Sequence, residues 1–101
     1  MKFKGTPGPW SAHDDEESMA TSVVMNDFGD ILCVVGSYMT SVEEDYSNAN
    51  LIAAAPDLLE ALQEMTAIVK KNSYPQPDKP SSNYARAEWA ESIISKALGE
   101  E

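Results

Sequence analysis

The sequence contains a single histidine, His13, and a single cysteine, Cys33. Nucleophilic catalysis needs a cysteine or serine that a neighbouring base activates. Cys33 lies in the most apolar segment of the chain, where a thiol usually packs as a small inert hydrophobic group, whereas His13 precedes an acidic run. The two side chains are therefore expected in different environments. We predict that the protein is not an enzyme.

Carboxylates cluster at residues 14–17, directly after His13, and again at residues 43–45. Imidazole and carboxylate groups are good ligands for divalent metal ions. The first run, however, lacks the alternating acidic positions and the glycine of a calcium-binding loop, and its spacing matches no closed metal site. We predict solvated acidic loops that bind no metal and no cofactor. Imitation of nucleic-acid phosphates toward a basic host protein is an alternative role for the same runs.

Aromatic and amide side chains offer the best candidates for binding. Aromatic rings can stack against a nucleobase, and free backbone amides at the helix start expected near Ser47 can meet an anion. Trp89 belongs to an apolar stripe and is expected in the core. Trp10 is the stronger aromatic candidate, although covering the open end of a sheet is its expected main role. The candidate ligand- or partner-binding residues are Trp10, Tyr38, Tyr46, Asn48 and Asn50.

The length and charge of the chain limit its function. It has 101 residues with 17 acidic and seven basic side chains, and a formal net charge of −10. We predict a single domain over residues 1–101, and no direct nucleic-acid binding, because this charge repels phosphates and no basic stripe is visible. No apolar run approaches the roughly 18 residues of a membrane span, and no secretory signal is recognisable. We predict no membrane association and a cytoplasmic location.

The elements that position these residues are predicted from the pattern along the chain. Strand-like runs at residues 10–13, 21–25 and 31–36 predict a small antiparallel sheet within residues 9–38, with a β-hairpin between the last two runs. Helical patterns follow over about residues 47–71 and 82–98, separated by a proline-rich loop at residues 72–81. The predicted fold class is therefore α+β, with two or three α-helices packed on one face of the sheet.

Two local signals refine the first helical region. Ser41 and Glu44 have the spacing of a capping box. Pro56 interrupts the pattern, so we expect one helix to end near Ala54 and another to begin at Pro56, with a single kinked helix as the alternative. The apolar residues of this region, at alternating spacings of four and three, are expected to form the main core stripe: Leu51, Ala55, Leu58, Leu62, Met65 and Val69.

The strand at residues 31–35 is apolar on both faces. Strict alternation places Ile31, Cys33 and Val35 on one face, and Leu32 and Val34 on the other. The helices can cover one face of a short sheet, and a second copy of the chain is the simplest cover for the other. We therefore predict a homodimer or a larger even-numbered oligomer.

Two segments resemble a known family. Residues 6–10 read Thr-Pro-Gly-Pro-Trp, and residues 48–62 read Asn-Ala-Asn-Leu-Ile-Ala-Ala-Ala-Pro-Asp-Leu-Leu-Glu-Ala-Leu. Both are similar, in order and spacing, to motifs of a family of small accessory proteins encoded by tailed phages and prophages. The chain has Asn50 where that family commonly has arginine and Gly5 where it commonly has histidine, so no binding role is transferred to these positions. The resemblance implies a phage origin and a location in the bacterial host cytoplasm.

The resemblance and the lack of a catalytic set of side chains lead to one main functional hypothesis. We expect a non-enzymatic phage accessory protein that acts by binding. Counter-defence would be one such role, either by inhibiting a host protein or by sequestering a host signalling nucleotide. The alternatives are a structural or assembly protein that acts only through homo-oligomerisation, and an acidic nucleic-acid mimic.

Overall fold

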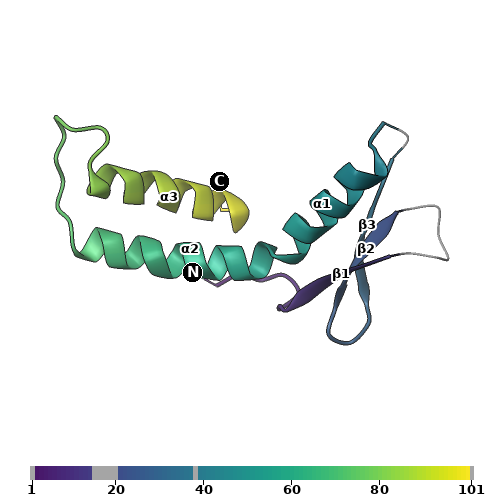
Figure 1. Cartoon of the computed structure of the whole chain (residues 1–101). Helices are drawn as coiled ribbons and strands as arrows, with labels where there is room; N and C mark the ends of the chain where they lie inside the picture. Colours follow the sequence, from purple (N-terminus) through teal and green to yellow (C-terminus); the bar gives the residue numbers. More distant parts are fainter. Residues whose placement is uncertain (1, 15–20, 38, 101) are drawn as a thin grey trace. The chain divides into compact units, whose positions relative to one another are not determined.

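The computed structural model describes residues 2–14, 21–37 and 39–100. It confirms the predicted α+β class: a three-stranded antiparallel sheet precedes three helices (Figure 1). The elements are β1 (Trp10–Asp14), β2 (Ser22–Asn26), β3 (Ile31–Val35), α1 (Val42–Ala53), α2 (Ala55–Lys71) and α3 (Asn83–Ala97). The chain divides into two compact units. We call Lys4–Asp57 the sheet unit, and Leu58–Glu101 with Met1–Phe3 the hairpin unit.

The sheet has the strand order β1-β2-β3, and the predicted β-hairpin joins β2 to β3. Its turn is closed by the side-chain oxygen of Asn26, which accepts hydrogen bonds from the backbone N–H groups of Phe28 at 3.0 Å and Asp30 at 2.9 Å. Gly29 has a φ of +83°, a conformation that glycine adopts without steric cost. The turn is therefore fixed by local residue chemistry.

The pairing of β2 with β3 contains an irregularity that strict alternation does not predict. Val24 lies opposite Cys33, but Met25 lies opposite Ile31, so the ladder skips Leu32. Directly opposed residues share a face of the sheet. Ile31 therefore lies on the face of Met25, and its predicted position on the face of Cys33 and Val35 is wrong.

The core of the sheet unit lies between the sheet and α1. Val24, Val35 and Ala49 form its buried centre. Partly buried apolar side chains pack around this centre: Trp10, Ala12, Cys33, Ile52 and Ala53. Because α1 contacts all three strands, it covers the face of the sheet that carries Val24.

The first helix begins earlier than expected, and the capping box explains why. The side chain of Ser41 accepts a hydrogen bond from the N–H of Glu44 at 3.1 Å, and the Glu44 carboxylate accepts one from the N–H of Ser41 at 3.2 Å. Helix α1 therefore starts at Val42 and not near residue 47. It ends at Ala53, and α2 starts at Ala55 with Pro56 in its first turn. The predicted division into two helices at this proline is confirmed.

In the hairpin unit, α2 and α3 run antiparallel (Figure 1). Its buried side chains are small: Thr66 on α2, and Ala87 and Ala90 on α3. The stripe that sequence periodicity assigned to the core is instead mostly exposed, with Met65 at 65% of its maximal accessibility. Trp89, also expected in the core, is 68% exposed. Periodicity identified an apolar face of α2 correctly, but the inner face of the hairpin is a neighbouring, less apolar one.

Candidate functional site

The connection from β3 to α1 is organised around the carboxylate of Asp45, which is 3% exposed. Thr21 Oγ1 donates a hydrogen bond to Asp45 Oδ2 at 2.8 Å, and Thr40 Oγ1 donates one to Asp45 Oδ1 at 2.6 Å. A buried carboxylate requires such partners, because it loses its hydration on burial. Asp45 thus ties α1 to the segment before β2 and to the loop after β3.

Gly36 allows this cluster to form. Its φ is +147°, and a Cβ at this position would lie 3.0 Å from the backbone nitrogen of Thr21. The N–H of Thr21 donates a hydrogen bond to the carbonyl of Val35 at 3.2 Å. The close approach brings the Thr21 hydroxyl to the Asp45 carboxylate, and a larger residue at position 36 would prevent it.

A shallow cavity of about 410 Å³ lies beside this cluster, between β3 and α1. Cys33, Val34, Val35, Leu51 and Ile52 give it an apolar wall, and Ser37, Thr40, Asp45 and Asn48 give it a polar rim. Among the described lining residues there is no lysine, arginine or histidine. The cavity can therefore take an apolar group with hydrogen-bonding edges, but it offers an anion no counter-charge.

Trp10 holds the N-terminal segment against the core. Its indole Nε1 donates a hydrogen bond to the carbonyl of Thr6 at 3.2 Å, and its ring packs beside the cluster of Val24, Val35 and Ala49. This placement agrees with its expected main role, the covering of the sheet.

Gly8, in the same segment, lies against the start of α2. A Cβ on Gly8 would be 2.9 Å from Pro56 Cβ, closer than real Cβ contacts. The Thr-Pro-Gly-Pro-Trp segment and the Ala-Ala-Ala-Pro segment, far apart in sequence, therefore touch. Sequence analysis noted both segments but gave no signal that they are neighbours.

The other described candidate binding residues lie on α1. Tyr46 and Asn50 are exposed and lie one turn apart on α1, whereas Asn48 is exposed on the side of α1 that borders the cavity. Tyr38 lies outside the described residues. Of the described members of the predicted set, Asn48 lines the cavity beside Asp45, whereas Trp10, Tyr46 and Asn50 are not among the residues that line it.

His13 and Cys33 lie on strands separated by β2. His13 pairs with Val23, next to Val24, and Cys33 pairs with Val24. Neighbouring residues of a strand point to opposite faces, so the imidazole and the thiol lie on opposite faces of the sheet. His13 Nε2 is instead 2.7 Å from Ser11 Oγ, in an exposed pair that sequence analysis did not identify. Because both side chains are exposed, water competes for their hydrogen bond. The pair does not lie in an enclosed site from which water is excluded.

The described residues contain no cluster of three or more His, Cys, Asp or Glu side chains that could hold a metal ion. The acidic residues at positions 15–17, which follow His13, lie outside the described residues. Within the described part of the chain, none of the helices combines the length and apolar character needed to cross a membrane.

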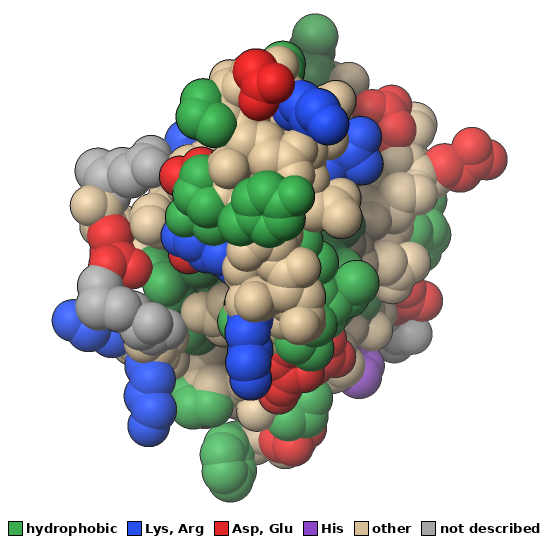
Figure 2. All heavy atoms as spheres, turned by 90° about the vertical axis from the view of Figure 1, so that its left-hand side faces the viewer, with side chains coloured by type: hydrophobic (Ala, Val, Ile, Leu, Met, Phe, Trp, Pro, Cys, Tyr) green, Lys and Arg blue, Asp and Glu red, His purple; other side chains and the backbone are tan. Residues whose placement is uncertain are grey.

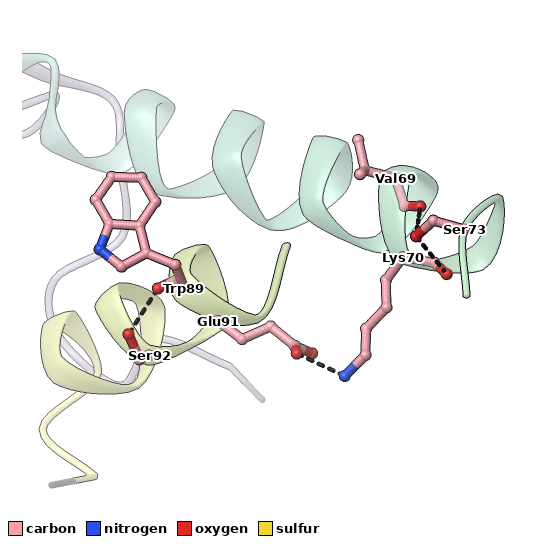
Figure 3. Close-up of polar contacts among 6 residues, drawn as sticks. All are labelled: Val69, Lys70, Ser73, Trp89, Glu91 and Ser92. Carbon is pink, nitrogen blue, oxygen red and sulfur yellow. Dashed lines mark hydrogen bonds and ion pairs between the residues drawn. The ribbon is translucent and has the colours of Figure 1, made fainter. Parts of the chain in front are cut away.

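An ion pair joins the two helices of the hairpin unit. Lys70 Nζ lies 2.6 Å from Glu91 Oε1, and 5.4 Å from the centre of the Tyr84 ring (Figure 3). The hydrogen bond to Glu91 is the main reason why the pKa of Lys70 is raised above its ordinary value of 10.5. In Figure 3 the Trp89 ring leaves α3 in a different direction from the Glu91 side chain.

Charge is divided unequally between the two units. The sheet unit contains ten acidic residues and one basic residue, Lys4, and so carries a formal charge of −9. The hairpin unit contains seven acidic and six basic residues, for a charge of −1. Figure 2 shows basic, acidic and hydrophobic side chains interspersed on the side of the molecule at the left of Figure 1. Almost the whole net charge of −10 therefore belongs to one unit.

No curated protein and no solved structure matches this sequence. One family model matches it over residues 1–101, the whole length of the chain, and is described as Salmonella phage P22 protein Y8K6. This match supports the phage origin inferred from two segments of the sequence. The chain belongs to the family of Salmonella phage P22 protein Y8K6, and is a phage protein.

Proposed function

We propose that this phage protein is a non-enzymatic binding protein that engages a basic surface of a host protein in the bacterial cytoplasm, through its sheet unit. The observation that carries the proposal is the division of charge: −9 on residues 4–57 against −1 on the rest of the chain. A field of one sign on one unit accelerates encounter with an oppositely charged partner and orients it. Solubility alone does not require such a division.

Six of the described carboxylates of the sheet unit fall into two groups. Asp45, Glu44 and Asp30 accept hydrogen bonds that hold the fold. Asp14, Asp27 and Glu43 are exposed, and no ion pair is found among the described residues of this unit. Among the described residues the second group thus has no ion-pair partner, and its carboxylates face solvent, as a surface for a basic protein requires.

The same charge argues against sequestration of a nucleotide. A nucleotide brings at least one phosphate, which needs a cation or several aimed N–H donors. The cavity beside Asp45 has a carboxylate on its rim and no basic side chain among its described lining residues. Of the two forms of counter-defence expected from the sequence, inhibition of a host protein is the better supported one.

The experiment compares two variants of the full chain with equal changes in charge. Asp14→Asn, Asp27→Asn and Glu43→Gln together remove three charges from the sheet unit. Glu60→Gln, Glu64→Gln and Glu88→Gln remove three from the hairpin unit, at positions that are also exposed. Each tagged protein is incubated with host lysate, retained proteins are identified by mass spectrometry, and the association rate of each retained protein is measured at two salt concentrations.

We expect a host protein with a basic surface to bind the wild type and the hairpin-unit variant. The sheet-unit variant should associate with it at least about tenfold more slowly at low salt, because electrostatic steering changes association rates by about 10- to 1,000-fold. An equal reduction of the association rate in both variants would contradict the proposal. Binding of the host protein that does not change with salt concentration would contradict it as well. Release of the partner by duplex DNA would identify the acidic surface as a nucleic-acid mimic.

Assembly remains the second candidate function, because large apolar side chains of the hairpin unit are exposed. A protein that acts only through assembly would retain no host protein in the experiment above.

A further inference from the structure

Strand β3 has an open edge. In the strand order β1-β2-β3, the described part of the chain places a neighbouring strand on one side of β3 only (Figure 1). The carbonyl of Val35 accepts a hydrogen bond from the N–H of Thr21, on the side of β2. Backbone polar groups of successive residues point alternately to the two sides of a strand, so the N–H and C=O of Val34 point to the open side. An open edge of this kind pairs with a further extended chain.

The cavity of about 410 Å³ beside Asp45 runs along this edge. Every residue from Cys33 to Ser37 lines it, although neighbouring side chains of a strand point to opposite faces. The cavity therefore follows the backbone of β3 and is not confined to one face of the sheet. Asn48 and Leu51 of α1 contribute to its other wall. An extended chain paired with β3 thus places a side chain between the strand and α1.

The chemistry of the lining indicates which side chain fits. Asp45 is the charged residue among the described lining residues, and the wall beside it is apolar at Val34 and Leu51. Each oxygen of the Asp45 carboxylate accepts a hydrogen bond from an uncharged threonine hydroxyl, and a carboxylate oxygen has two lone pairs. Lysine and arginine combine an apolar stem with a terminal cation, and so match both parts of the cavity.

A second copy of the chain does not meet these requirements. Each sheet unit carries a charge of −9, with Lys4 as its basic residue, so two sheet units repel each other. The strand that a second copy would add at this edge, β3 itself, reads Ile-Leu-Cys-Val-Val and contains no basic side chain. The same charge attracts a basic partner.

We propose that the sheet unit binds an extended segment of its protein partner along the open edge of β3, with a lysine or arginine of that segment in the cavity beside Asp45. The segment adds a further strand to the sheet. The stem of the basic side chain packs between β3 and Leu51, and its cation lies near the Asp45 carboxylate and the Asn48 amide. This inference rests on the proposed function and names the part of the basic partner that is recognised.

Selection from a library of random peptides about seven residues long, within the ordinary length of a strand, tests the inference on the full chain. We expect the selected peptides to share one lysine or arginine at a fixed position, flanked by residues that favour strands. Replacing this basic residue by methionine keeps a long apolar stem without the charge, and should raise the Kd at least about tenfold. Failure to select any peptide, or selection without a fixed basic position, would overturn the inference.

Asn48→Lys and Asn50→Lys form a matched pair of variants. Both residues are exposed on α1, and both substitutions add one positive charge, but Asn48 lines the cavity and Asn50 does not. Asn48→Lys should raise the Kd of a selected peptide at least about tenfold, because its cation repels the basic side chain at close range. Asn50→Lys should change the Kd less than about twofold. Equal effects would show that only the overall charge of the unit attracts the peptide, and would contradict the proposed cavity.

Val34→Pro and Val34→Ala test the pairing of the peptide with β3. Proline removes the N–H that points to the open side, a change that edge strands tolerate, whereas alanine keeps it. Val34→Pro should bind a selected peptide at least about fivefold more weakly than Val34→Ala. Circular dichroism confirms that each variant is folded. In the wild type, a bound peptide should slow hydrogen exchange of the Val34 amide, and an unchanged exchange rate would overturn the strand pairing whether or not Val34→Pro folds.

The experiment with host lysate separates this inference from the proposed function. A host protein that distinguishes the two charge variants but binds Asn48→Lys like the wild type would support the proposed function and overturn the inference. Selected peptides that bind in the cavity, with no host protein retained from lysate, would support the inference and contradict the proposed function. A wild-type dimer that Val34→Pro dissociates in sedimentation equilibrium would show that a second copy occupies the edge, and would overturn the inference.

Discussion

The two units of this protein differ in their interiors and in their charge. In the sheet unit, the interior contains a buried carboxylate with two hydroxyl partners and a core of Val24, Val35 and Ala49, and the unit carries nearly all the net charge. In the hairpin unit, the buried side chains are the small residues Thr66, Ala87 and Ala90, and the charges nearly cancel. The difference indicates that specific long-range contacts hold the sheet unit together, whereas the interior of the hairpin unit contributes less.

The largest effect is expected at Asp45. Asp45→Ala removes the carboxylate that accepts hydrogen bonds from the Thr21 and Thr40 hydroxyls. Both hydroxyls then lack this partner in a partly buried site. The free energy of unfolding, measured by urea denaturation, should fall by about 3 kcal/mol. Asp27→Ala is the control, because Asp27 is exposed in the same unit. This substitution should change the free energy of unfolding only slightly. Equal effects of the two substitutions would show that the Asp45 cluster does not hold the sheet unit together.

A smaller loss is expected at Gly8. Gly8→Ala introduces a Cβ 2.9 Å from Pro56 Cβ, and relief of this contact should cost about 1–2 kcal/mol of unfolding free energy. The effect should shrink in a Pro56→Gly background, which lacks the opposing Cβ, so a double-mutant cycle measures the coupling. Additive effects in that cycle would contradict the contact between the N-terminal segment and α2.

The smallest effect is expected in the hairpin unit. Glu91→Gln removes the partner of Lys70, but an exposed ion pair contributes little to stability. We expect no measurable change in the urea midpoint at pH 7. Because the pKa of Lys70 is raised in the folded chain, the small contribution of the pair is fully present below pH 10.5 and is lost as the pH rises through the folded-state value. A clear destabilisation at pH 7 would show that this unit, too, depends on specific polar contacts.

Features encoded by neighbouring residues were predictable from the sequence. The turn at Gly29, the break at Pro56 and the division of the chain into a sheet and helices depend on local backbone chemistry, and all three are confirmed. The capping box of Ser41 and Glu44 was visible as well, but the helix start was placed too late because the apolar pattern begins only after it.

Features that depend on distant residues were not predictable. Thr21 and Asp45 are 24 residues apart, and Lys70 and Glu91 are 21 apart, so no local pattern announces either contact. The strand pairing passes over Leu32 and so places Ile31 on the other face of the sheet. No residue type or spacing in the sequence predicts this irregularity. Periodicity found apolar stripes on α2 and α3 but could not tell that the smaller residues Thr66, Ala87 and Ala90 are buried instead, and for this reason Met65 and Trp89 were expected in the core.

Hydrogen exchange of the wild-type chain, followed by mass spectrometry at low and at high protein concentration, tests the contrast between the units most directly. Association protects the amides of the elements that it orders and buries. We predict that peptides from α2 and α3 become more protected at the higher concentration, while peptides from β1, β2, β3 and α1 exchange at unchanged rates. A concentration-dependent protection of β3 with none in α2 and α3, or no dependence anywhere, would contradict the account.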